Sequence, residues 1–410
     1  DRQEHHRGAL PAQLLGTGSD VVADGHLQLG HQLCIAECRC AAIHLRADAA
    51  TGQRTEVRCR QCRCALGVGR GDDRPRQRML AGTFQCGRQR IAEGYKTSGA
   101  QYLQRASAYY HVGERFLQPK SKAGNDAYMR GVDCFRDAAK YVKRPRMEHV
   151  EIPYEGASLP AIYVHAEPAN KSGKVPAMVF FDGLDVTKEI QYFKGVADLA
   201  ARGIACLIVD GPGNGESIRF RNFYLRHDTE HYATPAFDYL ASRPQIDAKR
   251  IGIMAISLGC YYAPRAAAFE QRFACCIAWG AQWDYRKIWA DRFERLAKAD
   301  TPSLSVAAQH IGWVLNVKTQ AEVLKALEPF KLDGVAQKIT CPFLMLHGEG
   351  DEQIPLPEAQ KCFDAVGSKQ KIFKLFTREE GGYHHCQIDN QSICSAYMWD
   401  WLEQVLQPAK

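Results

Sequence analysis

Ser257, Asp351 and the pair His384–His385 have the residue types and surroundings that nucleophilic catalysis needs. Ser257 is the middle residue of the stretch AISLG, with an apolar run before it and an alanine-rich stretch after it. A nucleophile on a sharp strand-to-helix turn needs small residues two positions before and after it, because strand and helix approach closely there. Ala255 adds one methyl group to that pattern. The context favours a nucleophile over the alternative, a serine that caps a helix.

Two later stretches supply the partners of such a serine. Asp351 ends the stretch PFLMLHGEGD, where a loop aspartate can orient an imidazole; the alternative is an aspartate that caps the helix beginning near Pro357. The stretch EEGGYHHCQIDN places two glycines before the histidines, and either His384 or His385 can serve as the base.

A fourth stretch, FFDGLDVTKE at 180–189, follows an apolar run. The backbone N–H groups of Leu184 and Leu258 are the candidate donors of an oxyanion hole, unless this stretch is an ordinary strand-to-helix turn. Asp185 is a candidate acid beside the substrate, or a cap of the next helix. The glycine-rich DGPGNGES at 210–217 lacks the lysine and the spacing of a phosphate loop, so we interpret it as a tight turn at the rim of the site.

Short apolar runs alternate with helical stretches through most of the chain. We predict strands at 177–183, 204–213, 250–257, 274–281, 342–351 and 370–376, and helices near 188–202, 229–242, 258–270, 356–367 and 391–407. Such alternation predicts an α/β fold with a mostly parallel central sheet and helices on both faces.

Other segments surround this alternating core. Two amphipathic helices are expected within 94–147, and a hairpin that turns at Glu155–Gly156 opens the first part of the core, 148–283. The segment 284–336 is helical and breaks the alternation, so we expect a lid over the carboxyl ends of the strands. The core then resumes over 337–410.

Residues 1–93 differ in composition from the rest. Residues 1–95 hold 14 arginines and no lysine, whereas 96–410 hold 18 arginines and 21 lysines. We interpret 1–93 as a leader of low order or a translation artefact, with a divergent extension as an alternative. A zinc module is another alternative, with ligands among His31, Cys34, Cys38, Cys40, His44, Cys59, Cys62 and Cys64.

The composition bounds the class of protein. Hydrophobic residues make up 46% of the chain and charged residues 24%, which is typical of a globular protein. The net charge of +7 is spread unevenly, and the arginine-rich segment 1–95 lacks interleaved aromatic residues, so we expect no nucleic-acid partner. No apolar run is long enough for a membrane span and no signal peptide begins the chain, so we expect a cytoplasmic protein that does not bind membranes.

Several of these motifs together carry a family resemblance. The stretches GLDVTKE, DGPGNGES, AISLGCYYAPRAA, GAQWDY, HGEGDEQIP and GGYHHCQ resemble the α/β-hydrolases that include 2,6-dihydroxypseudooxynicotine hydrolase and the fungal melanin-pathway hydrolases that shorten a polyketide. The resemblance runs from about residue 96 to the C-terminus. It implies Ser257 as nucleophile, Asp351 as orienting acid and His385 as base, since the family's base is followed by cysteine. It also implies a helical lid, no metal or organic cofactor, and is compatible with a homodimer.

The sequence therefore predicts a serine hydrolase that acts on a small molecule. The expected reaction is cleavage of a carbon–carbon bond beside a ketone in an aromatic or polyketide-like substrate. A carboxylesterase or acyl-peptide hydrolase with the same triad is the first alternative. A non-catalytic binding protein with a hydrolase fold is the second.

Overall fold

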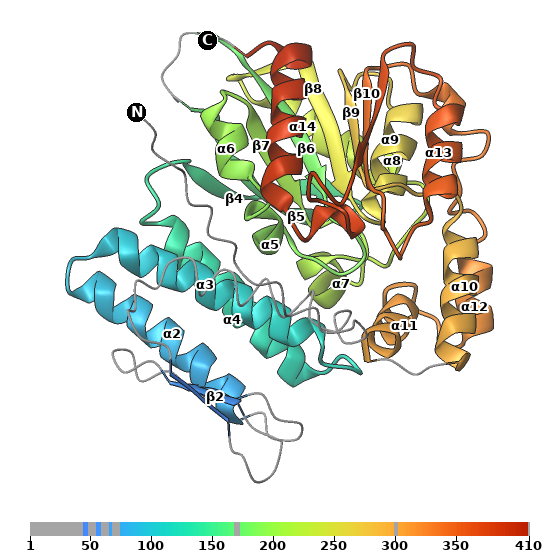
Figure 1. Ribbon diagram of the computed structural model, residues 1–410. Helices are drawn as coiled ribbons and strands as arrows, with labels where there is room; N and C mark the ends of the chain where they lie inside the picture. Colours follow the sequence, from blue (N-terminus) through green and yellow to red (C-terminus); the bar gives the residue numbers. More distant parts are fainter. Residues whose placement is uncertain are drawn as a thin grey trace, which may run out of the picture.

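The computed structural model describes residues 82–167, 173–298 and 307–408 in full, together with the backbone of elements at 44–47, 55–58, 65–67, 74–81 and 302–306. Within these residues, eight strands form one sheet in the order β11-β10-β9-β8-β6-β7-β5-β4 (Figure 1). The strands are β4 (Met147–Tyr154), β5 (Ala157–Val164), β6 (Val175–Phe181), β7 (Ala205–Val209), β8 (Ile246–Ile256), β9 (Cys276–Trp279), β10 (Phe343–Gly348) and β11 (Lys371–Phe376).

The sheet is mostly parallel, as predicted. Strand β6 pairs in parallel with β7 and β8, and the same direction continues through β9, β10 and β11. Only the pairings of β4 with β5 and of β5 with β7 are antiparallel. The predicted hairpin is confirmed: Glu155 and Gly156 between β4 and β5 both have positive φ, 44° and 75°, which suits a two-residue turn.

Helices cover both faces of the sheet because each central strand buries side chains on both sides. In β6, Ala177, Val179 and Phe181 face one core, while Met178 and Phe180 face the other. The first face packs against α8 (Glu230–Ser242), α9 (Gly259–Phe269) and α13 (Leu356–Ala365). The second packs against α5 (Lys188–Tyr192), α6 (Val196–Ala201) and α14 (Gln391–Leu406). Helix α7 (Gly215–Arg221) was not predicted, since its first residues belong to the glycine-rich stretch.

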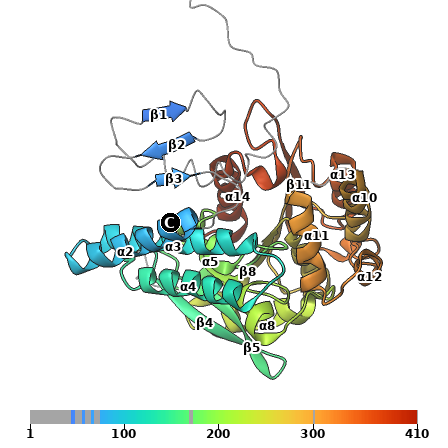
Figure 2. The same cartoon turned by 90° about the horizontal axis from the view of Figure 1, so that it is seen from below.

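A second layer of helices lies beyond the carboxyl ends of the parallel strands. It contains α3 (Lys96–Arg115), α4 (Lys122–Ala139), α10 (Tyr285–Lys298), α11 (Pro302–Val314) and α12 (Gln320–Ala326). Seen from that side, α3 and α4 run across the view and α11 stands to their right (Figure 2).

The segment before residue 94 contains further elements. Strands β1 (His44–Ala47), β2 (Thr55–Arg58) and β3 (Ala65–Gly67) pair antiparallel, and α2 (Arg74–Ala92) follows them. Phe84 and Ile91 of α2 pack against Ala100 and Leu103 of α3. The side chains of the zinc-module alternative lie outside the described residues.

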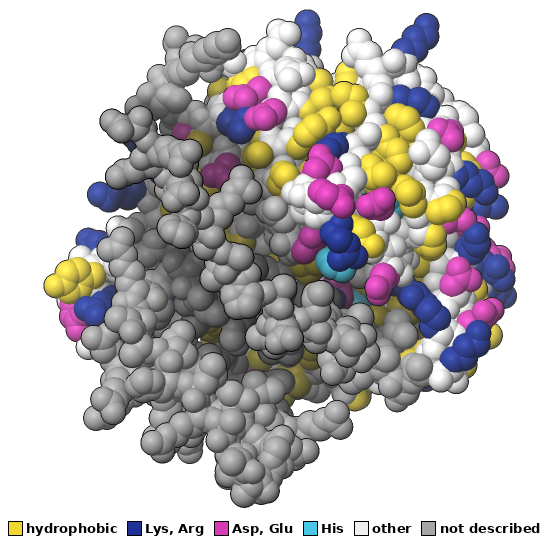
Figure 3. Space-filling model, in the orientation of Figure 1, with side chains coloured by type: hydrophobic (Ala, Val, Ile, Leu, Met, Phe, Trp, Pro, Cys, Tyr) yellow, Lys and Arg dark blue, Asp and Glu magenta, His cyan; other side chains and the backbone are white. Residues whose placement is uncertain are grey.

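Apolar helices and surface charges of the described part of the chain can be compared with the composition. No helix in that part is long and apolar enough to cross a membrane. On the described part of the face in Figure 3, basic and acidic side chains are interspersed.

Candidate active site

Ser257 lies on a strained turn between β8 and α9. Its φ is 59°, a left-handed conformation that is uncommon for a residue with a side chain, and its N–H donates to the Trp279 carbonyl over 3.0 Å. The turn leaves little room: a Cβ added to Gly259 would lie 2.5 Å from the Cβ of Ala255 and 2.9 Å from the backbone oxygen of Asp182. Ala255 is thus accommodated in place of glycine because its neighbour Gly259 has no side chain.

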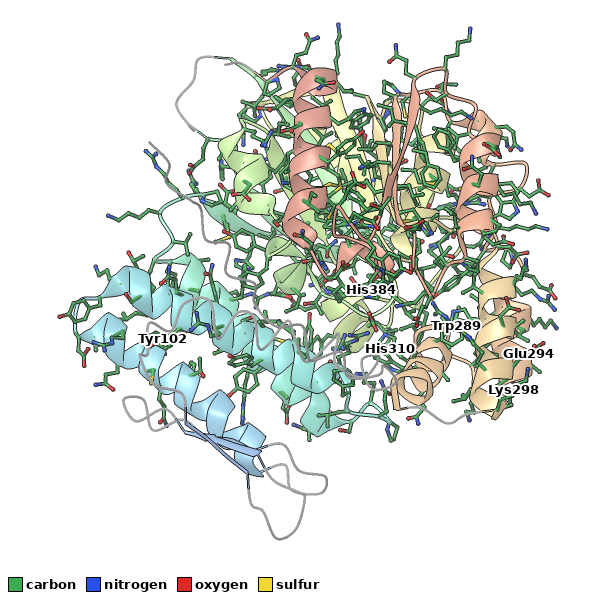
Figure 4. All side chains as sticks on the ribbon, in the orientation of Figure 1. Tyr102, Trp289, Glu294, Lys298, His310 and His384 are labelled. Atoms are coloured by element: carbon green, nitrogen blue, oxygen red, sulfur yellow. The ribbon has the colours of Figure 1, made fainter. Side chains whose placement is uncertain are left out.

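The structure brings Ser257, His385 and Asp351 together although they are far apart in sequence. The hydroxyl of Ser257 lies 2.8 Å from His385 Nε2, and His385 Nδ1 lies 2.7 Å from Asp351 Oδ2. Asp351 follows β10, and its Oδ1 accepts hydrogen bonds from the N–H groups of Gln353 and Ile354. His384 is exposed and contributes no atom to this chain of contacts (Figure 4).

The electrostatics of the pair follow from its burial. Burial lowers the pKa of His385, but the charge and hydrogen bond of Asp351, together with the neighbouring Cys386, outweigh burial, and the pKa is raised to about 10. For Asp351, burial opposes ionisation, yet the charge and hydrogen bond of His385 hold the carboxyl pKa below its usual value. The two groups therefore stabilise each other as an ion pair in a largely buried place.

Gly183 lies against the turn that carries Ser257. A Cβ at Gly183 would be 3.0 Å from Ser257 Cβ and 2.9 Å from the Ile256 carbonyl oxygen. The next residue is Leu184, and Leu258 follows Ser257. Among the residues that the structure describes, neither the Leu184 N–H nor the Leu258 N–H has a protein acceptor. Two backbone donors are thus left for a ligand beside the Ser257 turn.

Asp185 has a partner that the sequence did not indicate. Its carboxylate pairs with Arg115 of α3, with 2.7 Å between Oδ2 and Nε. The predicted helix cap is wrong, since Thr187 is the N-cap residue of α5 and the Lys188 N–H donates to Asp210. The ion pair of Asp185 with Arg115 joins the loop after β6 to α3.

Sequence reasoning missed two buried groups beside the loop that follows β6. His310 of α11 has its Nε2 3.2 Å from the Leu184 carbonyl, and burial lowers its pKa to about 4, so it is neutral and Nε2–H donates. Lys188 is 1% exposed and its ammonium contacts Asp210 and Glu216, each at 2.7 Å. Lys188 lies in the charged stretch TKE, which the sequence analysis had already singled out. No local pattern indicates His310, because its partner Leu184 is 126 residues away.

The described residues hold no group of three or more His, Cys, Asp or Glu side chains arranged to bind a metal ion.

Comparison with known proteins agrees with the fold. The family model of the prolyl oligopeptidase family matches residues 190–409. Hydrolase LUC6 of Fusarium sp is 31% identical over 336 residues, which cover 73% of this chain and 79% of that protein. The 2,6-dihydropseudooxynicotine hydrolase of Paenarthrobacter nicotinovorans is 27% identical over 327 residues, 78% of this chain and 81% of that protein.

A solved structure shows the same similarity in three dimensions. The crystal structure of the 2,6-dihydroxy-pseudo-oxynicotine hydrolase has a TM-score of 0.69 to this chain at 26% identity, and the match covers 81% of this chain and 88% of that one. The fold is therefore that of an α/β-hydrolase. The chain belongs to the prolyl oligopeptidase family, and it is an enzyme of the serine-hydrolase type. The resemblance to the pseudooxynicotine hydrolase group is confirmed.

Proposed function

We propose that this enzyme hydrolyses a carbon–carbon bond beside a ketone in an aromatic or polyketide-like small molecule, with Ser257 as nucleophile, His385 as base and Asp351 as its orienting acid. The observation that carries the proposal is the unbroken series of contacts from Ser257 through His385 to Asp351. The relative named as a pseudooxynicotine hydrolase supports the ketone substrate class.

The proposed reaction has two stages. In the first, His385 takes the proton of the Ser257 hydroxyl while the oxygen attacks the ketone carbon, and the resulting oxyanion accepts hydrogen bonds from the N–H groups of Leu184 and Leu258. Collapse of this intermediate breaks the carbon–carbon bond, and the leaving carbon takes the proton from His385. In the second, His385 takes a proton from the water that attacks the acyl group on Ser257; the bond from the acyl carbon to the serine oxygen then breaks, the carboxylic acid leaves, and His385 returns the proton to Ser257.

His385 is the proposed proton donor to the leaving carbon. Its raised pKa means that the protonated imidazole created in the first step is favoured at this place. Because Asp185 pairs with Arg115, we assign it the role of holding the loop after β6 in place. We expect Asp185→Asn to affect ketone cleavage and ester hydrolysis to similar extents. A loss confined to ketone cleavage would restore the acid role.

The first test is the nucleophile. Ser257→Ala should keep the melting temperature and lose turnover by about 10⁴- to 10⁶-fold, because removal of one triad member leaves only the residual catalysis of the binding site. A fluorophosphonate probe should label Ser257 in the wild type. Failure of the wild-type enzyme to react would favour a non-catalytic binding protein.

A second test concerns the histidines. His385→Ala should lose turnover as severely as Ser257→Ala, while His384→Ala is the matched control and should retain most of it, since His384 is exposed. The reverse pattern would show that His384 is the base.

The reaction class needs its own comparison. Turnover of a panel of aromatic β-diketones should be measured against 4-nitrophenyl esters, with product masses identified by mass spectrometry. We expect the ketones to be the better substrates. Ester hydrolysis without any ketone cleavage would make the enzyme a carboxylesterase or acyl-peptide hydrolase.

A further inference from the structure

The Asn214 side chain holds one particular peptide bond of the loop after β6. Its Nδ2 lies 2.9 Å from the Gly183 carbonyl oxygen and 3.4 Å from the Val186 carbonyl oxygen. Both partners are acceptors, so the side-chain amide donates to each of them. Asn214 is 4% exposed, and buried donors of this kind are costly to remove.

The geometry of a peptide bond gives this contact a consequence. The Gly183 carbonyl and the Leu184 N–H belong to the same peptide unit, and in a trans peptide the two groups point in opposite directions. A carbonyl held toward Asn214 therefore turns the Leu184 N–H away from Asn214. That N–H is one of the two proposed oxyanion donors, and Gly183 itself lies against the turn of Ser257.

Asn214 is itself held in place by the segment around it. It stands between Gly213 and Gly215, which have φ of 90° and 45°. A Cβ at Gly215 would collide with the Asp210 carboxylate, so this backbone passes directly over that side chain. The stretch DGPGNGES is thus a closely packed turn that places the Asn214 amide beside the loop after β6, where the sequence indicated only a turn at the rim.

We propose that Asn214 is a positioning residue that orients the Leu184 N–H toward the oxyanion of the reaction. The proposal rests on the proposed function of Ser257 and Leu184. His310 acts on the adjacent peptide: its Nε2–H donates to the Leu184 carbonyl, so the two side chains fix the peptide units on either side of Leu184.

The test uses Asn214→Ala and the nearly isosteric Asn214→Asp, whose carboxylate cannot donate. An oxyanion donor is worth about 10²- to 10³-fold in kcat, so we expect its misplacement to lower kcat by about 10- to 100-fold with KM little changed. The readouts are kcat and KM for a 4-nitrophenyl ester, the melting temperature, and the affinity for a trifluoromethyl ketone, which forms an oxyanion when Ser257 adds to it.

Gln271→Ala is the matched control. The Gln271 amide also donates to a backbone carbonyl, that of Ala268 at 2.8 Å, but it lies at the far end of α9 from Ser257. It should leave kcat unchanged. The double variant Asn214→Ala with His310→Ala should lower kcat by less than the product of the two factors measured for the single variants, because both side chains hold peptide units next to Leu184.

Three outcomes would overturn the inference. The first is a kcat loss in Asn214→Ala no larger than in the control. The second is a loss that appears only in KM or melting temperature, with ketone affinity retained. The third is a wild type that is neither labelled at Ser257 nor active on the ester, which would overturn the proposed function as well. A normal wild type with a normal Asn214→Ala variant would overturn the Asn214 role alone.

Discussion

At the scale of single residues, Ala255 and Gly259 share one small space in the turn that carries Ser257. The sequence showed that both are small, but only the structure shows that they face each other. Gly259→Ala should abolish activity and lower the melting temperature, because its new Cβ would meet both Ala255 and the Asp182 backbone.

The companion variant separates these two contacts. Ala255→Gly should be tolerated with little loss of activity, since it removes a methyl group from the crowded side. The double variant Ala255→Gly with Gly259→Ala should still have low activity, because the new Cβ at position 259 would still meet the Asp182 backbone oxygen. A fully active Gly259→Ala enzyme would contradict this account of the turn.

The pKa of His385 predicts the dependence of rate on pH. A base must be neutral to accept the proton of Ser257, and a pKa raised above the ordinary 6.5 keeps the imidazole protonated through neutral pH. We therefore expect kcat/KM on an activated ester to increase from pH 7 into the alkaline range.

Asp351→Asn supplies the control for this pH dependence. It removes the charge that raises the His385 pKa, so the ascending limb should shift to lower pH while the maximal rate falls by about 10⁴-fold, because the amide no longer holds the productive tautomer. If the ascending limb of the pH profile does not shift in Asp351→Asn, a group other than His385 controls the rate.

At the scale of elements, α5 is anchored by a buried cluster of charges. Lys188 at its start is surrounded by Asp210, Glu216 and Glu189 at 2.7 to 2.9 Å. Lys188→Met would leave Asp210 and Glu189 buried without this cation, while Glu216 would keep only Arg136, and the loss should cost about 3 to 5 kcal/mol of unfolding free energy. Urea denaturation measures this loss.

Lys140→Met is the control for that prediction. Lys140 pairs with Asp137 on the surface of the molecule, where solvent screens the two charges and the pair contributes little to stability. Equal stability changes in the two variants would mean that the cluster around Lys188 contributes no more than a surface ion pair.

The elements also show how far sequence reasoning extends. The strands, the hairpin at Glu155–Gly156 and the sharp turn at Ser257 follow from local patterns of apolar residues and turn residues, and they were predicted. The pairing of Asp185 with Arg115 joins residues 70 positions apart, and that of His310 with Leu184 joins residues 126 apart. Such partners depend on how helices pack over the sheet, which no local pattern specifies.

At the scale of the whole molecule, α2 belongs to the packed structure although its composition is that of the leader. Gly99 of α3 has no room for a side chain, since an added Cβ would lie 2.5 Å from Ile91 and 2.9 Å from the Gly87 carbonyl oxygen. A chain that begins at Met79 should therefore melt as the full chain does. A chain that begins at Tyr95 should melt at a lower temperature, because Leu103 loses its cover.

Thermal melting of the three chains checks this expectation, with ester turnover as a second readout. The chain from Tyr95 should still show activity at low temperature, since no α2 residue whose side chain the structure describes takes part in the contacts of Ser257, His385 and Asp351. Identical melting temperatures for all three would show that the packing of α2 on α3 adds nothing to stability.

The span of 128 residues between Ser257 and His385 has a consequence for biosynthesis. A ribosome completes β8 and the turn of Ser257 long before it makes β10 and the segment that carries His385. Nascent chains that stop short of residue 385 have the nucleophile without its base. Parallel pairing over long separations is slow, so the finished chain must also wait for its last strands to join the sheet. Hydrolytic activity therefore cannot appear before the segment that carries His385 has been synthesised and has joined the folded sheet.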